Sequence, residues 1–249
     1  MRVRFLKWGL LSLSLAILVL AGDVLAAEVN WGFGGFVGLN VPYRQMSDRY
    51  STAKKYGGSL NYVMGQTATL EIEYHHSQFN NGKLATKPFV WAVNKKTYTS
   101  PKANSEMTWK GLGLNAMVFP GEKNKTRGYK PKEYRFYVLV GGGFYRYRST
   151  LSGMIYPAQT KGIVDPVTKA QEIDPNVVMD PQVDQRYTLA ANVGLGLEGF
   201  LTDNVSIDVR GRYNLVIGQL RPMLFYKVNE AWPIMMFDVG VGLKFYFLK

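Results

Sequence analysis

The sequence predicts an all-β fold, an eight-stranded antiparallel up-and-down transmembrane β-barrel that follows a cleaved signal peptide. Three observations carry this prediction: eight segments in which apolar and polar residues alternate, connections that alternate in length, and an apolar N-terminal run behind basic residues. A period of two indicates extended strands, because successive side chains leave opposite faces of the pleat. Strands with an apolar outer face satisfy every backbone group in a bilayer only when they close into a barrel.

The first 26 residues read as a secretory signal peptide. Three basic residues precede the apolar run 10–21, and Ala26 closes a cleavage site of small residues. An uncleaved anchor is the alternative, but the run is short for a membrane span of about 20 residues. Removal of the signal leaves residues 27–249 as one barrel domain, a length that suits a single domain.

Eight alternating segments follow. The clearest lies at 205–215, where Val205 and Ile207 share one face, and Asp208 and Arg210 share the other. One side of this strand is therefore apolar and the other charged. The expected strands are 29–41, 57–64, 67–77, 108–119, 133–147, 188–201, 205–215 and 236–248. A soluble β-sandwich is the alternative fold, and it requires a second sheet that covers the apolar stripes.

The connections between these segments alternate in length. Tight turns lie at 64–67 and 201–204. The long connections are 42–56, 80–105, 149–187 and 218–233. The exception is 120–132, which is long and basic where a tight turn is expected. Short turns that alternate with long loops are typical of outer-membrane barrels, with the turns toward the periplasm and the loops toward the exterior.

On these features the chain resembles the small eight-stranded outer-membrane barrels, the broad family that includes the OmpA-like transmembrane domain and OmpW-like proteins. The resemblance covers essentially residues 27–249, and its final strand ends in Phe245, Tyr246 and Phe247. It implies a place in the outer membrane of a bacterium with two membranes, insertion by the barrel-assembly machinery, and contact with outer-membrane lipid and lipopolysaccharide. We expect a monomer with a structural, envelope-interacting role.

The composition excludes several other classes of protein. The chain has no cysteine, which rules out a disulfide framework, a lipoprotein anchor and a thiol site. The formal charge of +12 suits anionic headgroups, and we expect no nucleic-acid partner. The GxGxxG pattern at 194–199 leads into a turn and a strand instead of a helix, so no nucleotide site is expected. No metal or other cofactor is expected either.

The inward faces of the expected strands carry nearly balanced charges. An eight-stranded barrel is just wide enough for side chains to fill it, and buried charges must pair. We therefore expect an ion-pair plug that closes the lumen. The alternative is a narrow gated conduit for ions or small solutes, for which the inward glycines would leave room for water. The lumen charges are Glu71, Glu73, Arg135, Glu198, Asp208, Arg210, Arg212, Asp238 and Lys244.

One pattern suggests catalysis. His75 and Ser77 share a strand face, and Glu106 begins the next strand, an arrangement similar to the triad of outer-membrane lipid A deacylases. A serine nucleophile needs a base within hydrogen-bond reach and an orienting carboxylate. The same face carries Glu71 and Glu73, so both residues should point into the lumen. A lipid A-modifying hydrolase is thus the minor alternative, and we expect no enzyme and no catalytic residue.

Two loops carry the remaining signal. The loop 80–105 holds five lysines and no acid, which suggests contact with anionic headgroups. These lysines are Lys83, Lys87, Lys95, Lys96 and Lys102. The loop 149–187 contains three Asp-Pro pairs, and because proline and its preceding residue are conformationally restricted, an irregular and mobile loop is expected.

Overall fold

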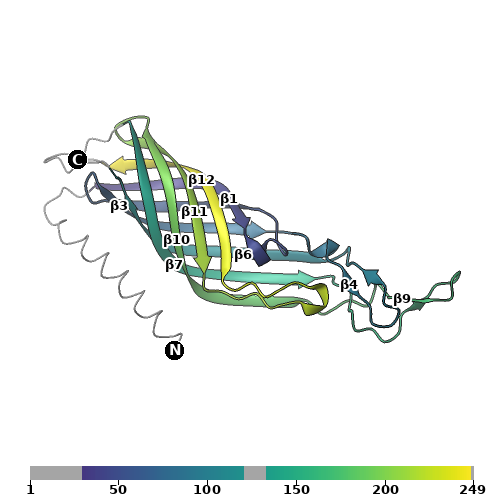
Figure 1. The fold of residues 1–249 in the computed structure, drawn as a ribbon. Coiled ribbons are helices and arrows are strands. Elements are labelled where there is room, and N and C mark those ends of the chain that lie inside the picture. The colour runs from purple at the N-terminus through teal and green to yellow at the C-terminus, as the bar shows by residue number, and fades with distance from the viewer. Residues whose placement is uncertain (1–29, 121–132, 248–249) are drawn as a thin grey trace, which may run out of the picture.

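The computed structural model describes residues 30–120 and 133–247, so the predicted signal peptide 1–26 lies outside the described residues. Eight long strands, each antiparallel to its neighbours, close in the order β1-β12-β11-β10-β7-β6-β3-β2 (Figure 1). These strands are β1 (Asn30–Pro42), β2 (Ala53–Val63), β3 (Ala68–Phe79), β6 (Asn104–Val118), β7 (Tyr134–Ser152), β10 (Gln182–Phe200), β11 (Val205–Val216) and β12 (Ile234–Phe247). The predicted eight-stranded barrel is confirmed.

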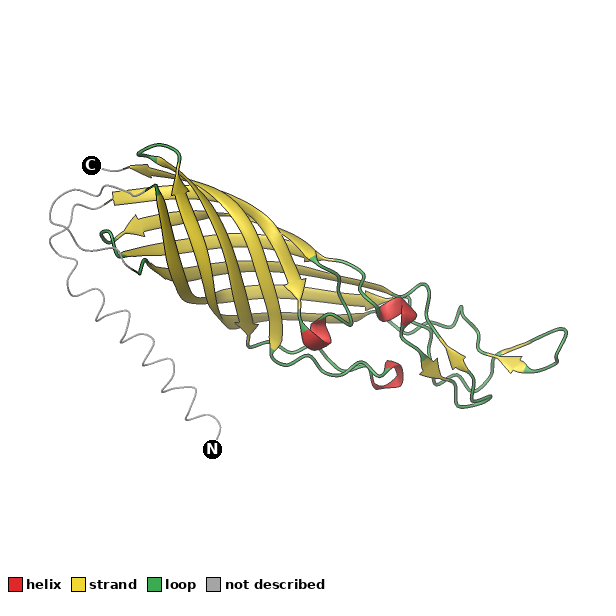
Figure 2. Cartoon of the chain, turned by 45° about the horizontal axis from the view of Figure 1, so that its top comes forward, coloured by secondary structure: helices red, strands yellow, loops and turns green. Residues whose placement is uncertain are grey.

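The long loops gather at one end of the barrel, and Figure 2 shows that they continue the long axis of the molecule. They contain four short strands and three 3-10 helices. These are β4 (Phe89–Val90), β5 (Thr97–Tyr98), β8 (Ile163–Val164), β9 (Gln171–Glu172), η1 (Arg44–Met46), η2 (Leu84–Thr86) and η3 (Leu224–Tyr226). The tight turns, the start of β1 and the end of β12 lie at the opposite end, where Trp31 pairs with both Tyr62 and Phe247.

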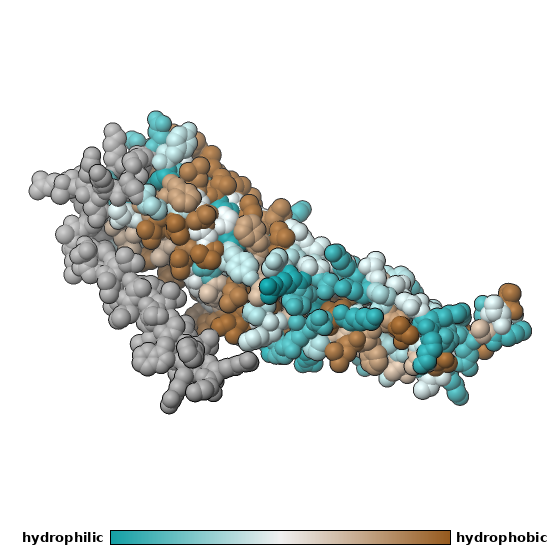
Figure 3. All heavy atoms as spheres, in the orientation of Figure 1, coloured by the Kyte–Doolittle hydropathy of each residue, from teal (hydrophilic) through white to brown (hydrophobic). Residues whose placement is uncertain are grey.

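The outer wall of the barrel is apolar. Outward residues such as Val193, Leu195 and Leu197 of β10 are about half exposed, while their polar neighbours Asn192 and Glu198 are buried. Figure 3 shows apolar side chains gathered over the barrel and hydrophilic ones mostly over the loop half. Among the described residues no second sheet covers this wall, so the soluble-sandwich alternative is wrong.

No helix in the described ranges has the length and apolar character needed to cross a bilayer.

Four strands reach further toward the loops than the sequence predicts. β2 begins at Ala53, β6 at Asn104 and β10 at Gln182, while β7 ends at Ser152. Most outward positions in these extensions are polar, with Tyr56, Val183 and Tyr187 as exceptions, so the hydrophobic alternation weakens although the backbone pairing continues. Cross-strand neighbours there are Lys54 with Gln78, and Arg148 with Thr108 and Gln185.

The loop 149–187 is irregular only in part. The segment contains the β8–β9 hairpin and a bridge between Ile155 and Val178. Two of the three aspartates that precede prolines form turns, and Asp165 Oδ1 accepts hydrogen bonds from the backbone N–H groups of Val167 at 2.8 Å and Thr168 at 3.2 Å. Aspartate followed by proline favours such a turn, because the carboxylate accepts from the backbone and proline presets φ.

Candidate functional site

Two arginines cross the barrel interior. Arg210 and Arg212 lie on β11, and their partners Glu71 and Glu73 lie on β3, four strands away in either direction around the ring. Arg210 binds Glu71 through two bonds of 2.6 and 3.1 Å, and Arg212 binds Glu73 through two bonds of 2.7 and 2.8 Å. Bidentate pairs of this kind combine strength with a fixed geometry. All four side chains are buried, so the pairs fill the cross-section.

The other predicted lumen charges join the same network. Arg210 Nε also donates to Asp208 Oδ1 at 2.9 Å, and Arg212 Nε donates to Asp238 Oδ1 at 3.0 Å. Lys244 Nζ lies 3.0 Å from Asp208 Oδ2. Toward the turn end, Arg135 Nε donates to Glu198 Oε2 at 2.8 Å. The structure thus places all nine residues of the predicted set inside the barrel.

Sequence analysis missed one member of this network. Lys55 is buried, and its Nζ lies 3.0 Å from Asp238 Oδ2 and 3.3 Å from Glu73 Oε1. The prediction placed Lys55 in a loop, because the alternation was read only from Gly57 onward. Continuing the odd-numbered inward positions upstream would have found it. With Lys55 the network contains five acids and five bases, which removes the cost of an uncompensated buried charge.

Neutral groups occupy the remaining acceptor positions of the buried acids. Tyr137 Oη donates to Asp208 at 2.7 Å, and Tyr246 Oη donates to Glu198 at 2.6 Å. Asparagine amides serve the others: Asn115 donates to Glu71 at 3.1 Å and Asn214 donates to Asp238 at 2.8 Å. A buried polar network in which the members are satisfied rigidifies the core that it forms.

Two of the inward glycines, Gly111 and Gly196, are covered by aromatic rings. A Cβ atom on Gly196 would lie 2.2 Å from the Tyr137 ring, and one on Gly111 would lie 2.6 Å from Tyr145 and 2.8 Å from His75. The space above these glycines is therefore filled by rings from neighbouring strands. At these two positions the inward glycines serve the packing of neighbouring aromatic rings.

Two buried clusters contact the charge network. At the loop end a buried cluster fills the barrel, with Trp109 stacked on Tyr147 at a ring separation of 5.7 Å. Its members are Met46, Tyr50, Ala53, Phe79, Met107, Trp109, Tyr145, Tyr147, Ala190, Val216, Leu220, Ala231, Ile234 and Met236. At the turn end, Met117, Phe119, Tyr137 and Leu139 form a second cluster. The apolar cluster thus covers the charges on the loop side, whereas Arg135 lies over Phe119 at the turn end.

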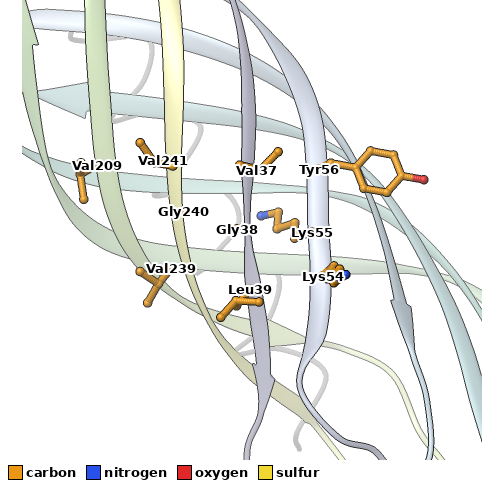
Figure 4. Close-up of a pocket in the computed structure, with 10 residues that line it drawn as sticks. All are labelled: Val37, Gly38, Leu39, Lys54, Lys55, Tyr56, Val209, Val239, Gly240 and Val241. Atoms are coloured by element: carbon orange, nitrogen blue, oxygen red, sulfur yellow. The ribbon is translucent and has the colours of Figure 1, made fainter.

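A hollow of about 530 Å³ lies on the outer wall (Figure 4). Most of its lining consists of outward side chains such as Val37, Leu39 and Val241, each exposed by 46% or more. The hollow passes over Gly38 and Gly240, which face each other in the β1–β12 register. Its open, apolar lining faces the surroundings of the barrel and not the lumen.

The suspected catalytic residues are not assembled into a triad. His75 Nδ1 lies 2.9 Å from Glu73 Oε1 in the interior, and Ser77 accepts a hydrogen bond of 2.8 Å from Asn40. Glu106 is exposed and accepts from Asn104 at 3.0 Å. His75 and Ser77 thus face inward and Glu106 outward. Within the described part of the chain, no group of three or more histidines, aspartates or glutamates is placed to hold a metal ion.

The long loops pack into one unit, here called the loop module, which comprises residues 43–52, 80–103, 153–181 and 217–233. Its buried cluster consists of Leu84, Phe89, Trp91, Ala103, Met154, Ile155, Ile173, Met223, Tyr226 and Val228, together with Leu151 from the end of β7. Trp91 Nε1 donates to the carbonyl of Gln159 at 2.8 Å, and Arg49 Nη2 donates to the carbonyl of Asn229 at 3.1 Å. These bonds join different loops, so the module has a core of its own.

The five loop lysines proposed for headgroup contact have different surroundings. Lys87 pairs with Asp48 at 2.8 Å, and Lys96 pairs with Glu172. The hydrogen bond and charge of Glu172 raise the pKa of Lys96, and the hydrogen bond from Lys96 lowers the pKa of Glu172. Lys83, Lys95 and Lys102 are exposed. Figure 1 places β4, which precedes Lys95, far from the barrel. In the basic connection 120–132, residues 121–132 lie outside the described residues.

Comparisons with solved structures return barrels of low sequence identity. Neisserial surface protein A matches with a TM-score of 0.44 at 10% identity, covering 89% of this chain and 100% of that chain. A major outer membrane protein from Thermus thermophilus matches with a TM-score of 0.47 at 8% identity and the same coverage. Ail, the attachment invasion locus protein of Yersinia pestis, matches with a TM-score of 0.41 at 11% identity, covering 88% and 98%.

No protein-family model and no curated protein sequence matches the chain.

The assignment of the barrel rests on its own architecture. The strands are antiparallel and even in number, and their ring is closed, so no unpaired sheet edge meets lipid. The outer wall is apolar, the interior is polar, and short turns alternate with long loops, which together define the barrels of bacterial outer membranes. The protein is an eight-stranded outer-membrane β-barrel.

Proposed function

We propose that the protein is a closed, non-conducting outer-membrane barrel that has a structural role in the envelope and holds the loop module at the cell surface for interaction. The observation that carries this proposal is the pair of bidentate arginine–glutamate contacts between opposite strands β3 and β11. Ions crossing the barrel would have to break these contacts and also displace the aromatic layer around Trp109.

The gated conduit is the second candidate, and a specific observation bears on it. Arg210 touches three acids, Glu71, Glu73 and Asp208, so it has alternative partners within reach. Removing one member of a buried pair costs about 3–5 kcal/mol, however, because the other charge stays buried. A gate would therefore need a concerted exchange of several pairs. The hydrolase alternative gains no support from the inward His75 and Ser77.

Single-channel conductance of the refolded mature chain in planar bilayers tests the proposal. We expect silence from the wild type, because both the charge network and the apolar layer close the lumen. The positive control is a triple variant, Trp109→Ala with Arg210→Ala and Arg212→Ala, which removes both barriers and should conduct. Exposed Lys161→Ala serves as the matched neutral control and should stay silent.

Discrete openings in the wild type whose conductance changes in Arg210→Ala would replace the closed barrel with the gated conduit. Silence from the wild type together with openings from the triple variant shows that the recording detects a path when one exists. Insertion of each protein is verified by its heat-modifiable gel mobility before recording.

A further inference from the structure

We propose that the outer wall formed by β3, β6 and β7 binds the phosphorylated headgroup of an outer-leaflet glycolipid through Lys110, Arg146 and Arg148, with His76 beside them. The inference deepens the envelope-interaction role and rests on the barrel's place in the outer membrane. It assigns headgroup contact to the wall of the barrel, in place of the lysines of the loop 80–105.

The strand register brings these side chains together. Lys110 pairs with His76 on one side and with Arg146 on the other, so the three form a continuous row across β3, β6 and β7. Arg148 lies on the outward face two residues beyond Arg146, opposite Thr108. Directly paired side chains in antiparallel strands have Cβ atoms about 4.5–5.5 Å apart. Lys110, Arg146 and Arg148 are all exposed.

The row lies at the border of the apolar wall. The next outward row toward the turn end pairs Tyr74 with Leu112 and Leu112 with Phe144, and these three are exposed by 51–73%. Lys110 and Arg146 are therefore each two residues beyond a lipid-facing side chain on their own strand, and Arg148 is four residues beyond Phe144. Phosphate groups of a bilayer lie directly outside its hydrocarbon, and long basic side chains at this border reach toward them.

These cations also lack an internal partner. Among residues 30–120 and 133–247 no acid forms an ion pair with Lys110, Arg146 or Arg148, whereas the lumen cations are paired. Arg146 lies over the ring of Tyr187 at 5.4 Å, which orients its guanidinium but leaves the charge uncompensated. The nearby acid Glu106 is directed to Asn104. Arginine matches phosphate geometry through parallel hydrogen bonds, so a phosphate would supply the missing charge.

The outward cations near the loops lie on one side of the barrel, on β6 and β7 and, through Lys54, on β2. On β11, β12 and β1 the outward positions near the loops are Leu215, Met235 and Val41. A general preference for basic residues at the membrane border would surround the barrel. Because these cations lie on neighbouring strands, we expect them to bind one headgroup that carries several phosphates. Nonspecific attraction to anionic lipids would not require such clustering.

Native mass spectrometry of the refolded mature chain, titrated with bisphosphorylated lipid A in mixed micelles, tests the inference. The test variant is Lys110→Gln with Arg146→Gln. The matched control, Lys102→Gln with Lys161→Gln, removes the same charge from exposed loop positions. We expect the test variant to weaken lipid A binding at least about tenfold and the control to leave it within about twofold. Dephosphorylated lipid A should bind the wild type as weakly as bisphosphorylated lipid A binds the test variant.

Three outcomes overturn the inference: no binding by the wild type, equal losses in both double variants, or full competition by millimolar inorganic phosphate, which would indicate a site for free phosphate. Arg146→Lys keeps the charge and should retain most of the binding if the test variant fails to fold. A wild-type barrel that inserts and stays silent but binds no lipid A contradicts only this inference. Conduction by the wild type contradicts the closed barrel but does not affect the conclusion drawn from lipid A binding.

Discussion

The barrel and the loop module are built in opposite ways. The barrel has charged residues such as Arg210 and Glu71 in its interior and apolar residues such as Leu195 on its wall. The loop module has Trp91 and Tyr226 in its interior and charged residues outside, as a water-soluble domain does. The chain changes from a charged interior to an apolar interior at the loop end of the barrel, where the apolar outer wall ends. Whether lipid or water surrounds a region thus decides which side chains form its core. Backbone pairing between strands occurs in both regions.

The largest expected effect is on the charged interior. Arg210→Ala leaves Glu71 and Asp208 without their shared partner and should lower the free energy of unfolding by about 3–5 kcal/mol. Urea titration in lipid vesicles, followed by tryptophan fluorescence, measures this loss. Arg210→Ala with Glu71→Ala should lose less than the sum of the single losses. A single-variant loss below about 1 kcal/mol would mean that water replaces the missing guanidinium, and that the interior is not a closed core.

A smaller effect is expected where rings cover the inward glycines. Gly196→Ala places a Cβ atom 2.2 Å from the Tyr137 ring and should destabilise the barrel by about 1–3 kcal/mol through overpacking. Gly199→Ala on the same strand is the control, since its Cβ would meet the Tyr134 ring at an ordinary 3.4 Å. The urea midpoints of unfolding of Gly196→Ala and Gly199→Ala are compared, and that of Gly196→Ala should be lower. Equal midpoints would show that the interior has free space.

The smallest effect concerns the loop module and depends on pH. The folded-state pKa of Glu172 is lowered, so its stabilising contribution exists above its unfolded pKa and is lost as pH falls through the folded value. The pKa of Lys96 is raised, so its contribution is lost only as pH rises through its own folded value. The contact joining the two loops should therefore be complete at neutral pH and weaken in acid.

Hydrogen exchange of the β8–β9 hairpin, corrected for the intrinsic pH dependence, measures this change. Protection should fall in acid in the wild type, while Glu172→Gln should show the lower protection already at neutral pH. Protection in the barrel strands should not follow the same profile. A hairpin whose protection is independent of pH in the wild type would contradict a role for this pair.

The period of two was enough to predict the barrel and most of its inward residues, because each strand repeats the rule locally. The partners of those residues did not follow from it. Arg210 meets Glu71 across the lumen only because β11 and β3 are opposite in the closed ring, which depends on register and stagger around all strands. Lys55 was missed because the alternation was read only from Gly57 onward, which assigned Lys55 to a loop.

The loop module was the least predictable region. Its core joins residues as distant as Trp91 and Gln159, or Ser100 and Tyr226, and no local periodicity marks such contacts. The Asp-Pro pairs were recognised as restrictions on the backbone, but their outcome was read as irregularity. Asp165 shows the opposite, because its carboxylate caps the turn that reverses the chain between β8 and β9.

The cross-lumen pairs have a mechanical consequence. A thin tube under uneven lateral pressure flattens by shortening one diameter and lengthening another. Arg210–Glu71 and Arg212–Glu73 act as two struts along one diameter, each ending in a pair of hydrogen bonds of 3.1 Å or less. Flattening in either direction would compress or stretch these bonds, so the cross-section resists deformation most strongly along the line from β3 to β11.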